Sequence, residues 1–154
     1  MNGSKFQLLD SYFDARLGEP PRAVDAAAVA DRARRVRRMS QRLNELAYPV
    51  FREFADYFEA RLGEAAECYV DRDDGLDAMG RDTPPHVGFR WGAQGGRLNE
   101  VVFTGDVDAG EVHATWRCWR HGIPVRGDKT LDPFWSPPLV HSMLQELIFQ
   151  FPPL

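Results

Sequence analysis

Residues 100–118 read EVVFTGDVDAGEVHATWRC, and this stretch decides the fold. On both sides of a turn at residues 108–110, apolar and polar residues alternate with the period of two that is typical of antiparallel strands. When Phe103 is placed opposite Ala114 and Val101 opposite Trp116, the bulky residues fall on one face. The stretch therefore predicts a β-hairpin with one apolar face and one polar face.

The polar face of this hairpin carries charged and histidine side chains in rows. A preceding strand at residues 86–91 alternates in the same way and adds one member to each row, and Trp119 lies on the same face. Opposite charges face each other across the strands, as cross-strand pairing prefers, although charge was not used to choose the register. The predicted rows on this open face are Arg90–Glu100–Arg117 and His86–Thr104–His113.

A long helical pattern precedes the sheet, at residues 23–62, after a shorter one at residues 6–17. Its apolar stripe continues in phase through Pro49, which falls on the opposite, solvent-facing side. We therefore expect one long helix kinked at Pro49, or two helices in nearly continuous register, ending at Gly63. The stripe contains Val29, Ala33, Val36, Met39, Leu43, Leu46, Ala47, Val50, Phe51, Phe54, Tyr57, Phe58 and Leu62.

A last helix is predicted at residues 136–151, with the Ser136 hydroxyl as its N-terminal cap and Pro137 in its first turn. Its apolar side chains, from Leu139 to Phe151, cover an arc of roughly 180° around the helix. That arc is wider than one contact with a sheet requires. We expect another helix, or a second subunit, to cover the remainder.

These segments together predict an α+β fold in a single domain. The N-terminal helices (residues 1–63) and the C-terminal helix pack on one face of a four- to five-stranded antiparallel meander (residues 64–128). The alternation does not determine the pairing register of the strand at residues 123–127.

Composition limits the classes of function. The chain has 154 residues, a net charge of −4 and a pI near 5.5, which argues against non-specific binding of nucleic acid by the whole molecule. Cys68 and Cys118 lie at core-facing strand positions, and we interpret both as small buried hydrophobes. No leader peptide and no membrane-spanning run is apparent, so we expect a cytoplasmic protein.

Motifs for nucleophilic catalysis, nucleotide binding and metal binding are absent from the sequence. His86 and His113 lie two strands apart, about 10 Å at Cα, without an obvious third ligand. We therefore predict no catalytic residue, no metal and no cofactor, and a non-enzymatic role is favoured.

Two further segments are candidate partner-binding surfaces. The helix carries an arginine ridge between Arg32 and Arg42, in which Arg34, Arg35, Arg38 and Arg42 are the candidates. In a proline-stiffened loop, Phe134 and Trp135 either cover the core beneath the last helix or present an apolar anchor to a partner.

The favoured hypothesis is a non-catalytic protein-binding module, such as an adaptor, a chaperone-like protein, an inhibitor or an immunity-type protein. It would act through apolar and arginine-rich surface on another protein or, as a homodimer, on a second copy. One alternative is a small-molecule-binding protein or enzyme with a pocket between helices and curved sheet, lined by Trp91, Trp116, Phe54 and Phe58. A second alternative is nucleic-acid binding through the arginine ridge, which lacks interleaved aromatic residues for stacking.

Overall fold

The computed structural model describes residues 6–17, 23–63, 66–75, 83–92 and 96–153. The chain divides into two compact units, residues 1–32 and residues 33–154. The first unit contains α1 (Gln7–Leu17) and the beginning of α2 (Ala23–Leu46). Val29, which the apolar stripe included, is exposed in this unit. Large apolar side chains of α1 and of the residue before it are also exposed: Phe6, Leu8, Leu9, Tyr12 and Phe13.

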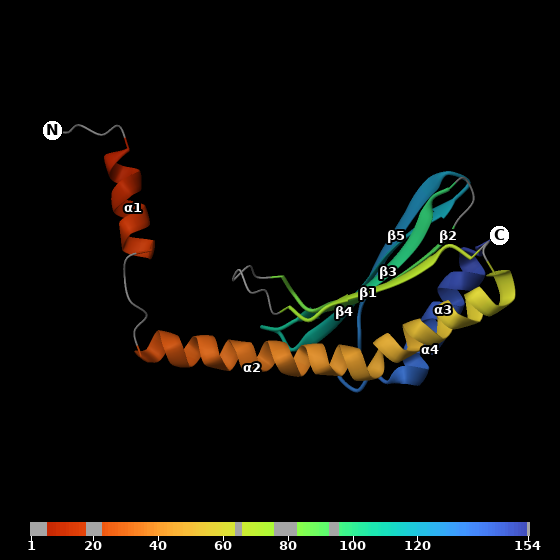
Figure 1. Ribbon diagram of the computed structural model, residues 1–154, viewed down its shortest axis with the longest axis horizontal. Coiled ribbons are helices and arrows are strands. Elements are labelled where there is room, and N and C mark those ends of the chain that lie inside the picture. Colours follow the sequence, from red (N-terminus) through yellow and green to blue (C-terminus); the bar gives the residue numbers. More distant parts are fainter. Residues whose placement is uncertain (1–5, 18–22, 64–65, 76–82, 93–95, 154) are drawn as a thin grey trace. The chain divides into compact units, whose positions relative to one another are not determined.

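The second unit is built on a five-stranded antiparallel sheet whose strands follow one another in chain order (Figure 1). Each strand pairs with the next, so the predicted meander is confirmed. The strands are β1 (Cys68–Asp73), β2 (His86–Gly92), β3 (Leu98–Asp106), β4 (Glu111–Arg120) and β5 (Ile123–Thr130).

The register of the three central strands is the predicted one. Phe103 pairs with Ala114 and Val101 with Trp116 across β3 and β4. Val87 pairs with Phe103 across β2 and β3. The alternation thus identified the core-facing side of these strands correctly, because a slip of one residue would expose every one of these apolar side chains.

The β4–β5 hairpin is closed by a two-residue turn. His121 and Gly122 both have positive φ, 52° and 77°. That backbone suits the right-handed twist of a hairpin, and it fixes which residues of β5 face β4. It places Arg126 opposite Arg117, a pairing that the sequence pattern left open.

The helical segment is kinked where Pro49 predicted it. α2 ends at Leu46 and α3 (Tyr48–Leu62) begins two residues later, with Pro49 exposed in its first turn. Backbone hydrogen bonds of 3.0 Å from Ala47 N to Leu43 O and from Phe51 N to Ala47 O bridge the break. Proline lacks an N–H, so one hydrogen bond of the helix is missing at the kink. The two bonds on either side of it keep α2 and α3 nearly continuous.

The helices of this unit cover one face of the sheet. α3 contacts β1 and β2, and α4 (Pro137–Gln150) lies beside α3 (Figure 1). The indole nitrogen of Trp91 donates to the backbone oxygen of Phe151 at 2.8 Å, which ties the chain's last turn to the sheet. The predicted α+β architecture is confirmed. The largest side chains of the core, all but excluded from solvent, include Leu43, Phe51, Phe89, Trp91, Phe103 and Leu144.

The cap of α4 differs from the prediction. Ser136 occupies the N-cap position, but its hydroxyl makes no capping hydrogen bond. The next two residues are Pro137 and Pro138, which have no N–H to donate to that hydroxyl. The first available donors, Leu139 N and Val140 N, bond instead to the Ser136 carbonyl oxygen at 3.0 and 3.2 Å.

The two cysteines differ in their environments. Cys118 is fully buried and Cys68 is half-buried, so the expectation of two buried thiols is correct only for Cys118. Burial raises the pKa of Cys118 to about 11. Burial also raises the pKa of Cys68, and the nearby Glu59 carboxylate adds to this increase.

A thiol whose pKa is raised reacts slowly, because the thiolate is the nucleophile. We expect iodoacetamide at pH 8 to alkylate Cys68 slowly and Cys118 more slowly still in the folded protein, measured by mass spectrometry of the two peptides. In guanidinium chloride both should react at one fast rate. Alkylation of Cys118 in the folded protein at the unfolded rate would contradict this.

Candidate functional site

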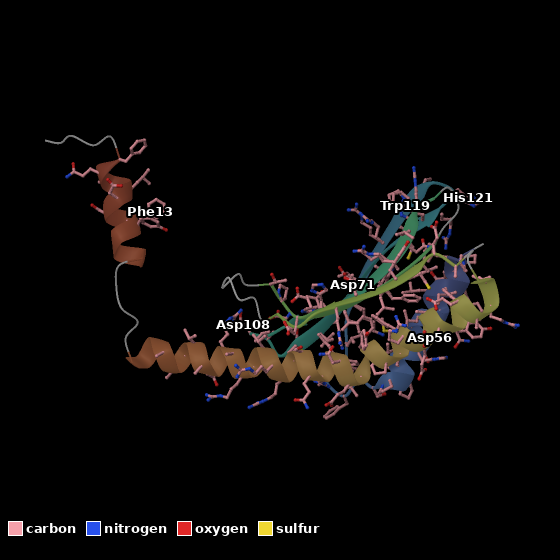
Figure 2. The ribbon with its side chains drawn as sticks, viewed as in Figure 1. Phe13, Asp56, Asp71, Asp108, Trp119 and His121 are labelled. Atoms are coloured by element: carbon pink, nitrogen blue, oxygen red, sulfur yellow. The ribbon has the colours of Figure 1, made fainter. Side chains whose placement is uncertain are left out.

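The open face of the sheet, opposite α3 and α4, carries one row of side chains that crosses all five strands. In strand order the row consists of Tyr69, Arg90, Glu100, Arg117 and Arg126, and we call it the arginine row. Tyr69 and the three arginines are exposed, whereas Glu100 is half-buried. In Figure 2 Trp119 projects from the side of the sheet that bears this row, while Asp56 of α3 lies on the helical side.

Within the arginine row, the single acid is already engaged. The Glu100 carboxylate accepts from Arg90 Nε at 2.7 Å, so it neutralises the arginine on β2. On its other side Glu100 faces Arg117, and Arg117 in turn faces Arg126. Among the residues that the structure describes, neither Arg117 nor Arg126 forms an ion pair. Two like charges therefore stand directly opposite each other, an arrangement that slightly destabilises a sheet.

A third arginine lies near the same end of the sheet. The Arg97 guanidinium stacks over the Trp119 ring at 4.4 Å and donates to the Gly122 carbonyl oxygen at 2.7 Å. Trp119 is half-buried, and its indole nitrogen donates to Leu98 O at 3.1 Å. Positive charge thus gathers at the β4–β5 side of the open face, while Asp71 lies on the same face of β1 at the opposite edge.

The histidine row is assembled as predicted, and Thr130 of β5 extends it opposite His113. His113 Nδ1 lies 3.0 Å from the Thr130 hydroxyl, and its Nε2 lies 3.8 Å from carboxylates of both Asp106 and Glu111. His86 Nδ1 lies 3.1 Å from a backbone oxygen. Within the described part of the chain, no three His, Cys, Asp or Glu side chains converge as a metal site would require.

The four candidate arginines of α2 differ in their exposure and contacts. Arg34 and Arg38 are exposed, whereas Arg35 is half-buried with Asp108 at 4.0 Å. Arg42 donates to the Pro133 backbone oxygen and stacks on the Trp135 ring at 5.3 Å. A shallow cup of about 330 Å³ opens here, and its lining residues are Arg35, Arg38, Met39, Arg42, Val107 and Gly110.

The proline-stiffened loop separates its two aromatic residues. Trp135 is buried, 4% exposed, with its ring edge-on to Phe103 at 6.1 Å. Phe134 is 91% exposed. Trp135 therefore covers the core, and a partner that docks on this loop would meet Phe134 and not Trp135, because the core encloses the indole.

An apolar groove between α3 and α4 was not among the predicted sites. Its volume is about 410 Å³, and Phe149 and Tyr57 at its margins are 75% and 56% exposed. The wide apolar arc of the last helix is the sequence feature that could have indicated this groove. α3 covers part of that arc, and Ile148 remains half-exposed. The groove is lined by Glu53, Phe54, Tyr57, Phe58, His141, Gln145, Ile148 and Phe149.

Two residues predicted to line a pocket above the sheet belong to this groove instead. Phe54 and Phe58 face the space between α3 and α4, and Trp91 is fully buried beneath the helices. Tyr57, assigned to the buried stripe, is exposed because the groove lies open at its position.

Comparison with known proteins adds no functional information. No protein-family model matches the chain, and no significant similarity was found to characterised proteins or solved structures. Within the described residues, no helix combines the length and the apolar character needed to cross a membrane.

Proposed function

We propose that this chain is a non-catalytic protein-binding module, and that the groove between α3 and α4 receives an amphipathic helix of a partner protein. The observation that carries the proposal is an apolar groove of about 410 Å³ with two aromatic side chains, Phe149 and Tyr57, exposed at its margins. Exposed aromatic residues beside a groove are typical of the sites that dominate binding energy in protein interfaces.

The spacing of the lining residues suits a helical partner. His141, Gln145 and Ile148 lie four and three residues apart on α4, and Phe54 and Phe58 lie four apart on α3. Each helix therefore contributes a ridge, and a third helix can place its own apolar ridge between the two. α4 has 14 residues and is thus about 21 Å long, enough to contact four turns of a partner helix.

The acidic residues beside the groove indicate which charge the partner helix should carry. Glu53 lines the groove, and Glu146 lies one turn before Phe149 on α4. Both are exposed, and neither forms an ion pair with another residue that the structure describes. Arg52, the nearby cation of α3, is bound to Asp56 at 3.2 Å. The preferred occupant is therefore a helix with apolar residues at i, i+3 or i+4 and i+7 and with Lys or Arg beside them.

A labelled amphipathic Leu/Lys peptide as long as α4 serves as the probe, with fluorescence anisotropy as the measurement. We expect Phe149→Ser to weaken binding at least about 10-fold, because it removes an aromatic anchor at the groove margin. Phe134→Ser is the matched control, since Phe134 is even more exposed than Phe149 but lies outside the groove, and it should leave the affinity unchanged.

Other outcomes would overturn the proposal. Equal affinities for wild type and Phe149→Ser would exclude the groove as the docking site. Loss of binding in Phe134→Ser alone would move the docking site to the proline-stiffened loop. Light scattering that shows a dimer in wild type and a monomer in Phe149→Ser would make a second copy the occupant in place of a separate partner.

A further inference from the structure

We infer that the β4–β5 end of the arginine row is a second binding site, which takes the carboxylates of an acidic protein segment. The residues that would bind them are Arg117 and Arg126. This site is independent of the proposed groove, because it lies on the opposite face of the sheet.

The geometry of the pair suits a carboxylate. Arg117 and Arg126 are directly opposite each other on neighbouring strands, so their Cβ atoms lie about 5 Å apart. Both side chains are exposed and extend from a rigid sheet. Guanidinium groups bind carboxylates through two parallel hydrogen bonds, and two adjacent guanidinium groups can hold one carboxylate or two neighbouring ones.

In the described part of the chain, no acid forms an ion pair with Arg117 or Arg126. Glu100 is bound to Arg90 at 2.7 Å, and Asp128, the next open-face acid along β5, lies opposite Thr115. A cross-strand pair of like charges contributes nothing favourable to folding. A bound anion would remove the repulsion, which is the physical reason to expect a ligand here.

The side chains beside Arg117 and Arg126 indicate which kind of residue accompanies the acidic residue in the bound segment. Trp119 and Pro124 pair with each other beside the arginines and form an apolar patch on the same face. An acidic residue bound by the arginines would place an adjacent apolar residue of the same segment on this patch. The ligand is therefore a short segment in which Asp or Glu neighbours an apolar residue.

An acidic protein segment fits better than a single-stranded nucleic acid. The two arginines are close together, whereas Asp71, Glu100 and Asp128 are distributed over the rest of the face and would repel a phosphate backbone that crossed it.

The test uses a labelled short peptide, in which two glutamates flank a leucine, and a labelled oligothymidylate strand with the 154-residue chain. We expect the peptide to bind wild type with an affinity that falls as salt is added. Arg117→Glu and Arg126→Glu should each weaken it about 10-fold. Lys129→Glu is the matched control, because it makes the same charge change on β5 but on the opposite face, and it should alter the affinity less than about 2-fold.

A stability measurement separates loss of the site from loss of the fold. Arg126→Glu places an opposite charge beside Arg117, so its melting temperature should rise by about 1–3 °C while binding falls. Phe149→Ser should bind the acidic peptide as wild type does, which distinguishes this site from the groove. Absence of peptide binding to wild type, an equal loss in Lys129→Glu, or a preference for oligothymidylate would each overturn the inference.

Discussion

Replacing Phe51 with alanine is expected to lower the free energy of unfolding by about 3–5 kcal/mol. Phe51 is fully buried, and its ring lies edge-on to Phe103 at 5.2 Å and 6.2 Å from Phe89. It therefore joins α3 to the two central strands β2 and β3. Truncation removes the burial of an aromatic ring and leaves a cavity that a close-packed core fills only in part.

Phe149→Ala is the control for this experiment, since Phe149 is 75% exposed on α4. Its effect on stability should stay within about 0.5 kcal/mol. Urea denaturation followed by circular dichroism measures both variants. If Phe51→Ala cost no more than Phe149→Ala, the packing of α3 against β2 and β3 would be refuted.

Replacing Asn99 with aspartate is expected to cost about 3–5 kcal/mol at pH 7 and almost nothing near pH 4. Asn99 is fully buried at a core-facing position of β3, and its Oδ1 accepts from Trp119 N at 2.8 Å. Aspartate has the same shape and keeps that acceptor. The expected loss is therefore the cost of an ionised carboxylate in the core.

The direction of the pH dependence follows from linkage. Burial raises the pKa of the introduced carboxyl in the folded protein above its unfolded value of about 3.9. Between these two values the unfolded chain ionises and the folded chain does not. Stability therefore falls by about 1.4 kcal/mol for each unit of rising pH and levels off above the folded pKa.

Asn44→Asp makes the same chemical change at a half-buried position of α2, and we expect it to cost less than about 1 kcal/mol at every pH. Denaturant titrations at pH 4, 5.5 and 7 compare the two variants. A loss in Asn99→Asp that did not vary with pH would show that the buried position tolerates charge, and it would refute the electrostatic explanation.

The central sheet and the helical segment could be predicted from local patterns. In β2, β3 and β4 a one-residue slip would move residues such as Phe89, Val101 and Phe103 to the open face, so one register alone keeps them buried. The same reasoning places Arg90, Glu100 and Arg117 in one row. Pro49 could likewise be placed on the solvent side, because the phase of the stripe does not change across it.

The pairing of β5 could not be predicted in this way. Its sequence, IPVRGDKT, has no clear alternation, so neither register is favoured by burial. The turn that sets this register, His121-Gly122, is not one of the residue pairs that favour positive φ most strongly in such turns. Packing also restrains the register of β5. A Cβ atom at Gly127 would lie only 2.3 Å from the ring of Trp116 on β4, so only glycine fits opposite this tryptophan.

Strand alternation and helical phase are properties of neighbouring residues, and they were enough to specify the class of fold, its core face and most of the open-face rows. The groove and the Arg117–Arg126 pair each depend on elements that meet across long stretches of chain: α3 with α4, and β5 with β4. The relative placement of those elements determines which part of the apolar arc of α4 stays uncovered. It also determines which arginines form no ion pair with an acidic residue. Periodicity along one segment carries no information about that placement.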